Sequence, residues 1–362
     1  MNLNIICCTE NKLRFAWETR VLLTSLREFD YSDKARVLIY KSQESTHSEW
    51  LNLQHEYPEV QFFYYDDKNI MKTAKAFGYP PLCRLYCLQK HWEQFPYLEQ
   101  EAIFYCDTDI VFTKKFDFTP YLEDKINYLS WTGNIERTDN YLWQPYLDSK
   151  LDKVNPLKIE KFKKIDIVSR LGHICGINRE LITKNNENTG GAQYLLKNIN
   201  KQFWVDCFNT CCEIKMYLSD INQIYMQGTT AQERENNGFQ SWCADMIAVL
   251  YNLWKTVETR CPKEFDFAWS TDKIERLDDV FLLHNAGVTS DEKIAVANQR
   301  GENGERITLE GPLFFKGNSK YLVTTPQQDI EYLTNIYNNP INKQFCNNHY
   351  IKTILKSIKN EH

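Results

Sequence analysis

Two aspartates, Asp107 and Asp109, stand one residue apart just after a short apolar segment, 102–105. That segment reads Ala-Ile-Phe-Tyr, which is typical of a buried strand in a parallel sheet. In an extended chain, side chains at i and i+2 point the same way, so both carboxylates can face one point. Two hard oxygen donors at the carboxyl end of a strand suit a divalent cation that carries phosphates. The alternative interpretation is a pair of surface aspartates, because three-residue matches are common.

A histidine late in the chain, His284, is a candidate third ligand. It directly follows an apolar segment, 281–283, that predicts a strand. A neutral imidazole can complete a cation site that is otherwise built from oxygen. A hydrogen-bonded histidine in the core is the alternative.

A glycine turn that carries two lysines spans residues 314–321. Such a turn can present backbone amides and the ammonium group of Lys320, next to Gly317, to a diphosphate. A solvated surface hairpin is the alternative interpretation.

An acid, Asp245, lies inside an otherwise apolar helix expected from about 240 to 254. Trp242 stands almost one turn earlier, so the two side chains can project into one cavity. Their apolar neighbours predict burial, and a buried acid usually has a partner or a function. Stabilisation by the helix dipole is the alternative. Arg84, in the helix before the aspartates, can reach a phosphate or a carboxylate at the same edge, or form a plain salt bridge.

Gly190 and Gly191 supply flexible backbone directly before a helix expected over 192–218. This arrangement suits close approach of a ligand, and Gln193 and Trp242 are further candidates for lining such a pocket. The spacing is not that of a Walker or dinucleotide loop.

Strand and helix signals alternate over the first hundred residues. Strands are expected at 3–8, 36–40 and 60–65, with helices at 13–29, 47–56 and from 80 to about 92. This order predicts an α/β fold with a mostly parallel, doubly wound sheet flanked by helices. Ligands of such sheets bind beyond the carboxyl ends of the strands, where Asp107 and Asp109 stand. Further strands are expected at 126–132, 172–178 and 280–283, and the last helices at 326–338 and 342–358.

The 362 residues exceed the usual size of a single core. We find no internal repeat, low-complexity tract or linker. We therefore expect one catalytic domain over 1–325, with a C-terminal helical extension, 326–362, packed on it.

Composition and charge restrict the class of protein. The net charge of −5 gives no global positive field to attract nucleic acid or an anionic membrane. The first residues lack the pattern of a signal peptide, and no stretch approaches the roughly 18 apolar residues of a membrane span. The 12 cysteines have no zinc-site spacing and fit free thiols. We expect a cytoplasmic protein with no membrane contact and no obligate protein partner.

Taken together, these features resemble the glycosyltransferases of the GT-A fold, a Rossmann-like arrangement. The strand ending in Tyr-Cys-Asp-Thr-Asp, the Gly-x-Asn-Arg-Glu segment at 176–180 and the late His284 occur there in this order, and the resemblance covers about residues 1–325. It implies that Asp107, Asp109 and His284 hold Mn²⁺ (or Mg²⁺) against the diphosphate of a UDP-sugar donor.

Two shorter matches concern subgroups of that family. The His-x-x-Gly-x-x-Lys motif of glycogenin-like retaining enzymes is matched at Gly317 and Lys320, but Phe314 stands at the histidine position. Trp242 to Met246 is similar to the Trp-x-x-Glu-Met helix of the hydroxyproline arabinosyltransferase and serine galactosyltransferase group, with Asp245 in place of the glutamate.

The resemblance also implies roles for individual residues. The pocket for the sugar or the acceptor would be lined by Gly190, Gly191, Gln193 and Trp242. Lys320 or Arg84 would stabilise the departing diphosphate. Asp245 would stabilise the oxocarbenium-like centre or act as a nucleophile in a retaining reaction. In an inverting reaction it would deprotonate the acceptor hydroxyl instead.

The acceptor stays open: a glycan, a protein side chain or, as in phage-type enzymes, a hydroxymethylated DNA base. We expect segments 133–164 and 227–240 to determine it. A nucleotidyltransferase is a second possibility, although residues 7–11 read Cys-Cys-Thr-Glu-Asn where a glycine-rich basic loop would stand. A non-catalytic sugar-binding protein is a third.

Overall fold

The computed structural model describes most of the chain. The described residues are 1–41, 45–67, 70, 79–131, 166–225, 241–285, 327, 330–340 and 342–359. The chain divides into two compact units. The terminal unit comprises Leu3–Asp66, Phe104–Pro120 and Lys263–His362, and the central unit comprises Met1–Asn2, Asp67–Ile103 and Tyr121–Pro262.

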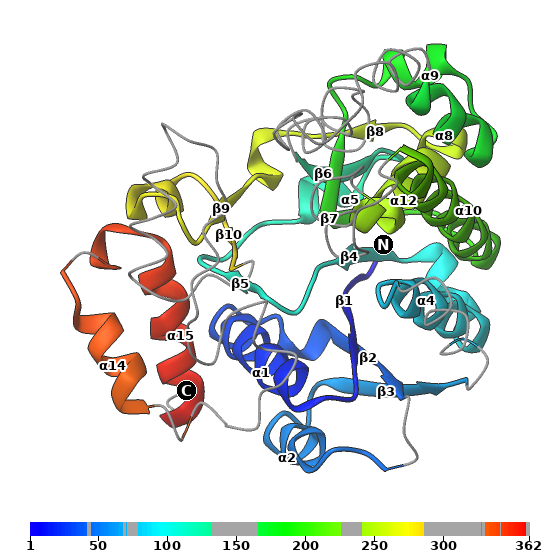
Figure 1. The fold of residues 1–362 in the computed structure, drawn as a ribbon. Helices are drawn as coiled ribbons and strands as arrows, with labels where there is room; N and C mark the ends of the chain where they lie inside the picture. The colour runs from blue at the N-terminus through cyan, green and yellow to red at the C-terminus, as the bar shows by residue number, and fades with distance from the viewer. Residues whose placement is uncertain are drawn as a thin grey trace. The chain divides into compact units, whose positions relative to one another are not determined.

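The terminal unit starts with alternating strands and helices (blue in Figure 1). They are β1 (Leu3–Glu10), α1 (Leu13–Glu28), β2 (Ala35–Lys41), α2 (Ser48–Glu56) and β3 (Gln61–Asp66). The three strands are parallel in the order β3-β2-β1, and the end of β4 (Ala102–Tyr105) lies beside β1. All of β2 is buried except its last residue, as its continuous apolar run predicts for a central parallel strand.

A second, three-stranded sheet of the terminal unit carries His284 and begins directly after Asp109. Its strands are β5 (Ile110–Phe112), β9 (Phe267–Trp269) and β10 (Leu282–His284), in the order β5-β10-β9. The middle strand β10 runs antiparallel to β5 and parallel to β9. This pairing joins β5 to two strands that lie some 150 residues later in the sequence.

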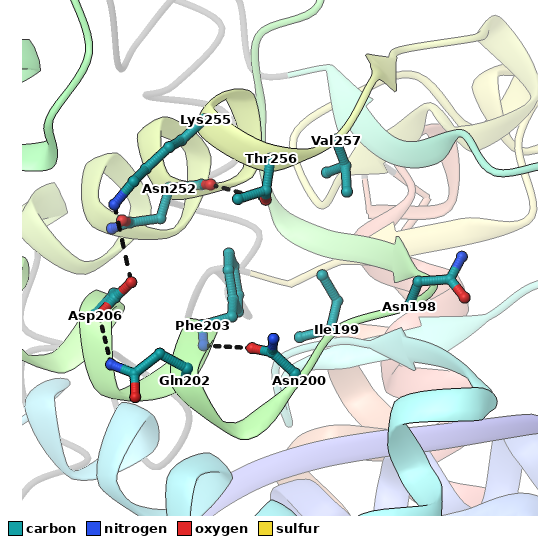
Figure 2. Close-up of a pocket in the computed structure, with 10 residues that line it drawn as sticks. All are labelled: Asn198, Ile199, Asn200, Gln202, Phe203, Asp206, Asn252, Lys255, Thr256 and Val257. Atoms are coloured by element: carbon teal, nitrogen blue, oxygen red, sulfur yellow. Dashed lines mark hydrogen bonds and ion pairs between the residues drawn. The ribbon is translucent and has the colours of Figure 1, made fainter.

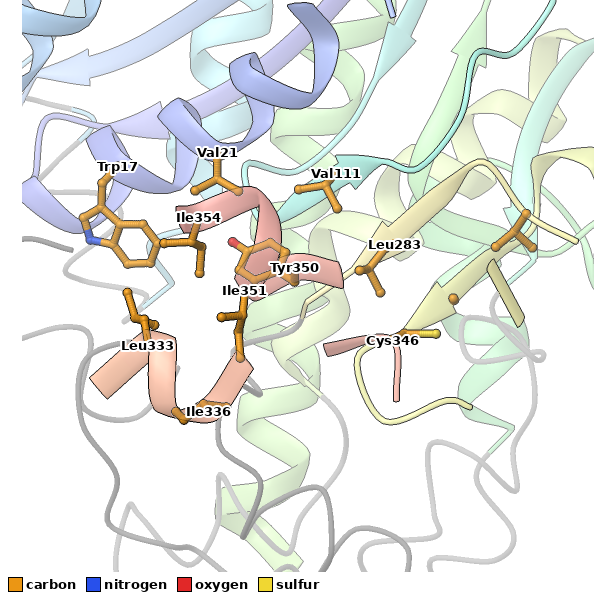
Figure 3. Packing of buried hydrophobic residues seen from close by; sticks show 12 residues of the cluster. Trp17, Val21, Val111, Leu283, Leu333, Ile336, Cys346, Tyr350, Ile351 and Ile354 are labelled. Carbon is orange, nitrogen blue, oxygen red and sulfur yellow. The ribbon is translucent and has the colours of Figure 1, made fainter. Parts of the chain in front are cut away.

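The C-terminal helices α14 (Ile330–Asn338) and α15 (Asn347–Lys359) share a buried core with α1 (Figure 3). The cluster includes Trp17, Val21, Leu333, Ile336, Tyr350, Ile351 and Ile354. Full burial of an aliphatic side chain contributes about 1.5–3 kcal/mol, so this contact holds the helices firmly within the unit.

The central unit contains the start of β4 and three further strands. They are β6 (Asn127–Trp131), β7 (Gly190–Leu196) and β8 (Thr259–Arg260), in the order β4-β7-β6-β8. Its helices are α4 (Leu82–Gln94), α8 (Ile167–Cys175), α9 (Arg179–Lys184), α10 (Lys201–Tyr225) and α12 (Ala244–Thr256). The long α10 packs against both α4 and α12.

Two segments of the central unit differ from the sequence prediction. The strand expected at 172–178 is wrong, because this segment belongs mainly to α8. Asp166 caps that helix by accepting the N–H of Ser169 at 2.9 Å, and Gly176 ends it with φ 77°. The helix expected from 192 is also wrong at its start: residues 190–196 form β7, and α10 begins only at Lys201.

The remaining elements are short. They are η1 (Ser32–Lys34), η2 (Pro96–Gln100), α5 (Thr119–Leu122), η4 (Ser241–Cys243), η5 (Lys263–Phe265), η6 (Ile274–Asp278) and η9 (Asn342–Gln344). The predicted α/β class, with mostly parallel strands flanked by helices and followed by C-terminal helices, is confirmed. Within the described part of the chain, every helix is too short or too polar to cross a bilayer. The predicted domain boundary near residue 325 stays a prediction.

Candidate functional site

The structure brings Asp107, Asp109 and His284 together in the terminal unit. One ligand atom from each lies within 4.8 Å of the others, and His284 Nε2 is 3.3 Å from Asp109 Oδ1. The cause is the pairing of β10 with β5, which places His284 opposite Ile110. The N–H of Asn285 also donates to the carbonyl oxygen of Asp109 at 2.9 Å, which continues this pairing by one residue.

The two aspartates converge for a reason other than the predicted one. The sequence predicted an extended chain through Asp107 and Asp109, whereas the strand stops at Tyr105 and a turn carries them to β5. Asp109 and His284 are 8% and 7% exposed, and Asp107 is only half-buried. The less buried Asp107 is therefore the more accessible of the two carboxylates.

Two thiols border this turn but are poor ligand candidates. Burial, with a contribution from Asp107, raises the pKa of the Cys7 thiol to about 12. Burial also raises the pKa of the Cys106 thiol well above its usual value. Both side chains therefore stay protonated at neutral pH, which leaves two carboxylates and one imidazole as the donor set. Oxygen ligands with one imidazole fit a divalent cation such as Mn²⁺.

His284 is also supported by aromatic side chains. The indole of Trp269 stacks on its imidazole with ring centroids 5.0 Å apart, and Phe267 lies at 5.8 Å. The Trp269 side chain is itself 40% exposed.

The central unit holds a second group of predicted residues. Asp245, in the first turn of α12, is buried and forms an ion pair with Arg84 of α4. The hydroxyl of Tyr79 is hydrogen-bonded to Asp245 Oδ1, and the N–H of Asp245 donates to that hydroxyl at 3.1 Å. Burial and the neighbouring Asp245 raise the pKa of Tyr79 well above its usual value, so Tyr79 remains a phenol that can donate to the carboxylate.

Trp242 differs from Asp245 in the exposure of its side chain, although its carbonyl oxygen accepts a hydrogen bond from the same Tyr79 hydroxyl at 2.7 Å. The sequence predicted that both are buried, but the Trp242 side chain is 45% exposed. The reason is that Ser241–Cys243 forms a 3₁₀ turn before α12, which changes the helical phase between the two positions.

Gly190, Gly191 and Gln193 lie on β7 rather than before a helix. A Cβ at Gly190 would lie 2.4 Å from Leu129 Cβ and 2.5 Å from the carbonyl oxygen of Ser130. This glycine therefore permits close pairing of β7 with β6. Gln193 is fully buried, and its side-chain amide has no hydrogen-bond partner among the described residues. Their predicted role in a sugar or acceptor pocket stays a prediction.

Several predicted residues fall outside the described part of the chain. They are Gly317, Lys320 and the acceptor segments 133–164 and 227–240.

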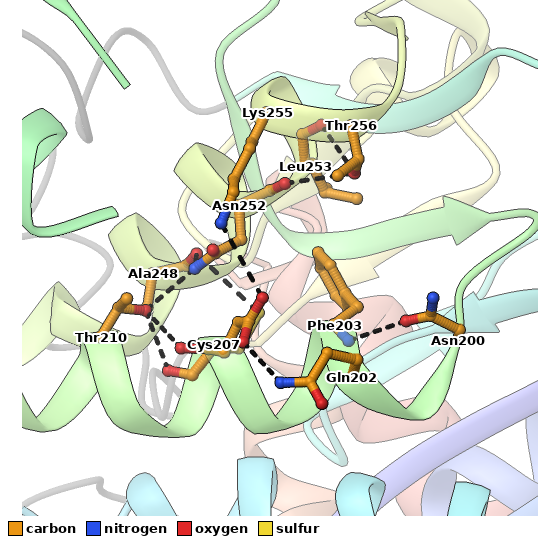
Figure 4. A network of polar contacts seen from close by, with 11 residues as sticks. Asn200, Gln202, Phe203, Cys207, Thr210, Ala248, Asn252, Leu253, Lys255 and Thr256 are labelled. Carbon is orange, nitrogen blue, oxygen red and sulfur yellow. Dashed lines mark hydrogen bonds and ion pairs between the residues drawn. The ribbon is translucent and has the colours of Figure 1, made fainter. Parts of the chain in front are cut away.

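A cavity of about 380 Å³ in the central unit was not predicted. Figure 2 shows that it lies between the β7–α10 connection and the end of α12. Its polar side chains mostly have local partners (Figure 4): Asp206 accepts from Gln202 at 2.8 Å, and Asn252 Nδ2 donates to Thr210 Oγ1 at 2.9 Å. Asn200 accepts the N–H of Phe203 at 2.9 Å and so caps α10. These hydrogen bonds have structural roles: they cap α10, connect residues within it and link it to α12.

Sequence reasoning missed Trp269 and the α1 residues Arg14 and Glu18, which lie behind the aspartate turn. The i, i+4 spacing of Arg14 and Glu18 was a usable signal for an ion pair. Nothing in the sequence around Trp269 indicates that it faces a histidine fifteen residues later.

Comparisons with known proteins concern the fold alone. No family model and no curated protein matches the sequence. An active-site mutant of the galactosyltransferase LgtC is similar over 90% of this chain and 99% of its own, with 12% identity and a TM-score of 0.42. The bifunctional glycosyltransferase WbbM is similar over 79% of this chain and 46% of its own, with 11% identity and a TM-score of 0.40.

Mouse xyloside xylosyltransferase 1 is similar over 79% of this chain and 98% of its own, with 10% identity and a TM-score of 0.34. The 46% coverage of WbbM means that this chain spans less than half of that protein. All three names are those of sugar-transferring enzymes, the class that the sequence resembles. At this level of similarity no residue's role is transferred from them.

Proposed function

We propose that the chain is a metal-dependent glycosyltransferase that moves a sugar from a UDP-sugar to an acceptor hydroxyl. The observation that carries the proposal is the convergence of Asp107, Asp109 and His284 at strand ends of one unit. This donor set suits Mn²⁺ or Mg²⁺. Such a cation, when bound, would neutralise the charge that develops on a departing diphosphate.

The chain's own residues would orient this site. Asp109 and His284 are buried and held by strand pairing, so their ligand atoms are preorganised. Asp107 is more accessible and would face the donor side. Lys320 and Gly317 stay the proposed contacts to the diphosphate.

Asp245 is the proposed catalytic carboxylate, in a reaction that we expect to retain configuration. Its support is a buried set of one acid, one guanidinium and one phenol. Such a set contributes little net stability compared with apolar residues of similar volume, which favours a functional reason for keeping it. The ion pair gives Arg84 a positioning role toward Asp245, and its predicted role at the diphosphate is proposed alongside.

A thermal-shift series with the intact chain tests the donor half of this proposal. A UDP-sugar should raise the unfolding temperature in the presence of Mn²⁺ and much less in its absence, because a ligand stabilises the state that binds it. Asp109→Ala should lose the Mn²⁺-dependent shift. No shift with any nucleotide-sugar would contradict the proposal.

Adding short glycans, peptides or duplex DNA to the donor complex extends the series to the acceptor. A further shift with hydroxymethylated DNA that disappears at high salt would favour the DNA-modifying alternative. A shift with a nucleoside triphosphate alone would favour a nucleotidyltransferase.

A further inference from the structure

The middle residue of the aspartate turn is anchored to α1. Thr108 is buried, and its Oγ1 donates a hydrogen bond to Glu18 Oε2 at 3.1 Å. Thr108 sits between the two aspartates, so a constraint on its side chain limits how the turn can rotate. The anchor therefore acts on Asp107 and Asp109 together.

Glu18 is itself held by a residue one helical turn earlier. Arg14 Nε donates to Glu18 Oε1 at 2.8 Å, and the side chains of Arg14 and Glu18 are only 12% and 7% exposed. Each oxygen of the Glu18 carboxylate thus has its own partner: Arg14 on one side and Thr108 on the other. Two directional bonds fix the rotation of the carboxylate, which one bond would not.

Arg14 and Glu18 also balance each other's charge next to the cation site. Asp109 lies close enough to interact electrostatically with both Arg14 and Glu18. A glutamate alone would add a third negative charge beside Asp107 and Asp109. With Arg14 beside it, Glu18 supplies a strong acceptor for Thr108 while the pair stays neutral.

We propose that Arg14 and Glu18 are positioning residues for the cation site and act through Thr108. The inference rests on the proposed function, since it assumes that Asp107, Asp109 and His284 hold a cation. The competing explanation is an ion pair that only contributes to folding of the unit, which buried pairs do weakly.

Calorimetric titration of the intact chain with Mn²⁺ alone separates the two explanations. Thr108→Val removes the hydroxyl at constant volume, and we expect it to weaken Mn²⁺ binding by about 10-fold or more, as loss of outer-shell partners does. Thr108→Ser keeps the hydroxyl and should bind within about threefold of wild type. Thr24→Val is the matched control, because Thr24 also carries a buried hydroxyl, on α1, that bonds to Tyr57 and the carbonyl of Arg20. It should lower stability and leave Mn²⁺ affinity unchanged.

A second variant keeps the test valid if Thr108→Val does not fold. Arg14→Met/Glu18→Leu replaces the pair by apolar side chains, a change that buried pairs often tolerate, and removes the acceptor of Thr108. It should weaken Mn²⁺ binding to a similar degree. Wild-type affinity in both Thr108→Val and the double variant would overturn the inference and leave the proposed function standing. Absence of Mn²⁺ binding by wild type, at the level of an Asp109→Ala blank, would overturn both.

Discussion

The imidazole of His284 lies against the indole of Trp269, with ring centroids 5.0 Å apart and ring planes at 26°. The two residues are register partners on the parallel strands β9 and β10. The stack sets the plane in which His284 Nε2 approaches Asp109 Oδ1 at 3.3 Å. A ligand nitrogen presents its lone pair in that ring plane, so Trp269 contributes to the cation site without being a ligand.

Trp269→Leu should weaken Mn²⁺ binding by about threefold to tenfold, because an aromatic pair contributes about 0.5–1.5 kcal/mol. Trp269→Phe keeps an aromatic face and should bind like wild type. Calorimetric titration with Mn²⁺ measures both. Trp131→Leu is a suitable control, since Trp131 is exposed to a similar degree and belongs to the central unit. Equal affinities for Trp269→Leu and wild type would show that the stack does not support His284.

Arg84→Met should destabilise the chain by about 3 kcal/mol, since it leaves a buried carboxylate without its guanidinium partner. Arg84→Met/Asp245→Leu removes both charges and should recover much of this loss. Urea unfolding measures the free energies. Lys90→Met, which removes a pair between two exposed side chains, should change stability by less than about 1 kcal/mol. Additive losses in the double variant would mean that the buried pair is not coupled.

Asp245→Asn should lower the rate of donor hydrolysis by about 100-fold or more, as expected for a carboxylate that acts on the reacting centre. Mn²⁺ affinity should stay at the wild-type level, because the ligands belong to the terminal unit. A coupled assay for released UDP gives the rate. Asp206→Asn, at a half-exposed acid of the same unit, serves as the control. An unchanged rate in Asp245→Asn would remove this residue from the proposed mechanism.

His349 on α15 should make stability depend on pH. Burial, with the nearby Lys352, lowers the pKa of His349 below its usual 6.5 in the folded chain. Between the two pKa values the unfolded chain binds more protons, so stability is full above pH 6.5 and falls as the pH drops below it. Unfolding of wild type and His349→Asn at pH 5, 6 and 7 measures this dependence. A slope that is the same in both proteins would contradict the assignment.

The sequence predicted the parts of the fold that rest on simple periodicity. The first three strands and their helices are apolar runs separated by polar turns, and they occur where expected. The candidate cation ligands were found for a related reason, because Asp107, Asp109 and His284 are polar residues that interrupt or end apolar strands. Their convergence depends on the pairing of β5 with β10, which no local pattern contains.

The errors have equally local causes. The segment 172–178 suggested a strand because the helical positions before it, Ile167, Val168 and Leu171, and the cap Asp166 were not considered with it. Gly190 was expected to stand directly before a helix, whereas it lies on β7 in close contact with Leu129. Long-range contacts such as Thr108 with Glu18 have no sequence signal beyond the i, i+4 charges on α1.

The central claim is that Asp107, Asp109 and His284 hold a cation that activates a UDP-sugar. Release of UDP from UDP-sugars by the purified chain, with and without Mn²⁺, tests it most directly. The account predicts slow, Mn²⁺-dependent hydrolysis of at least one UDP-sugar that Asp109→Ala abolishes while the variant remains folded. Hydrolysis that continues without a divalent cation, or at the wild-type rate in Asp109→Ala, would contradict it.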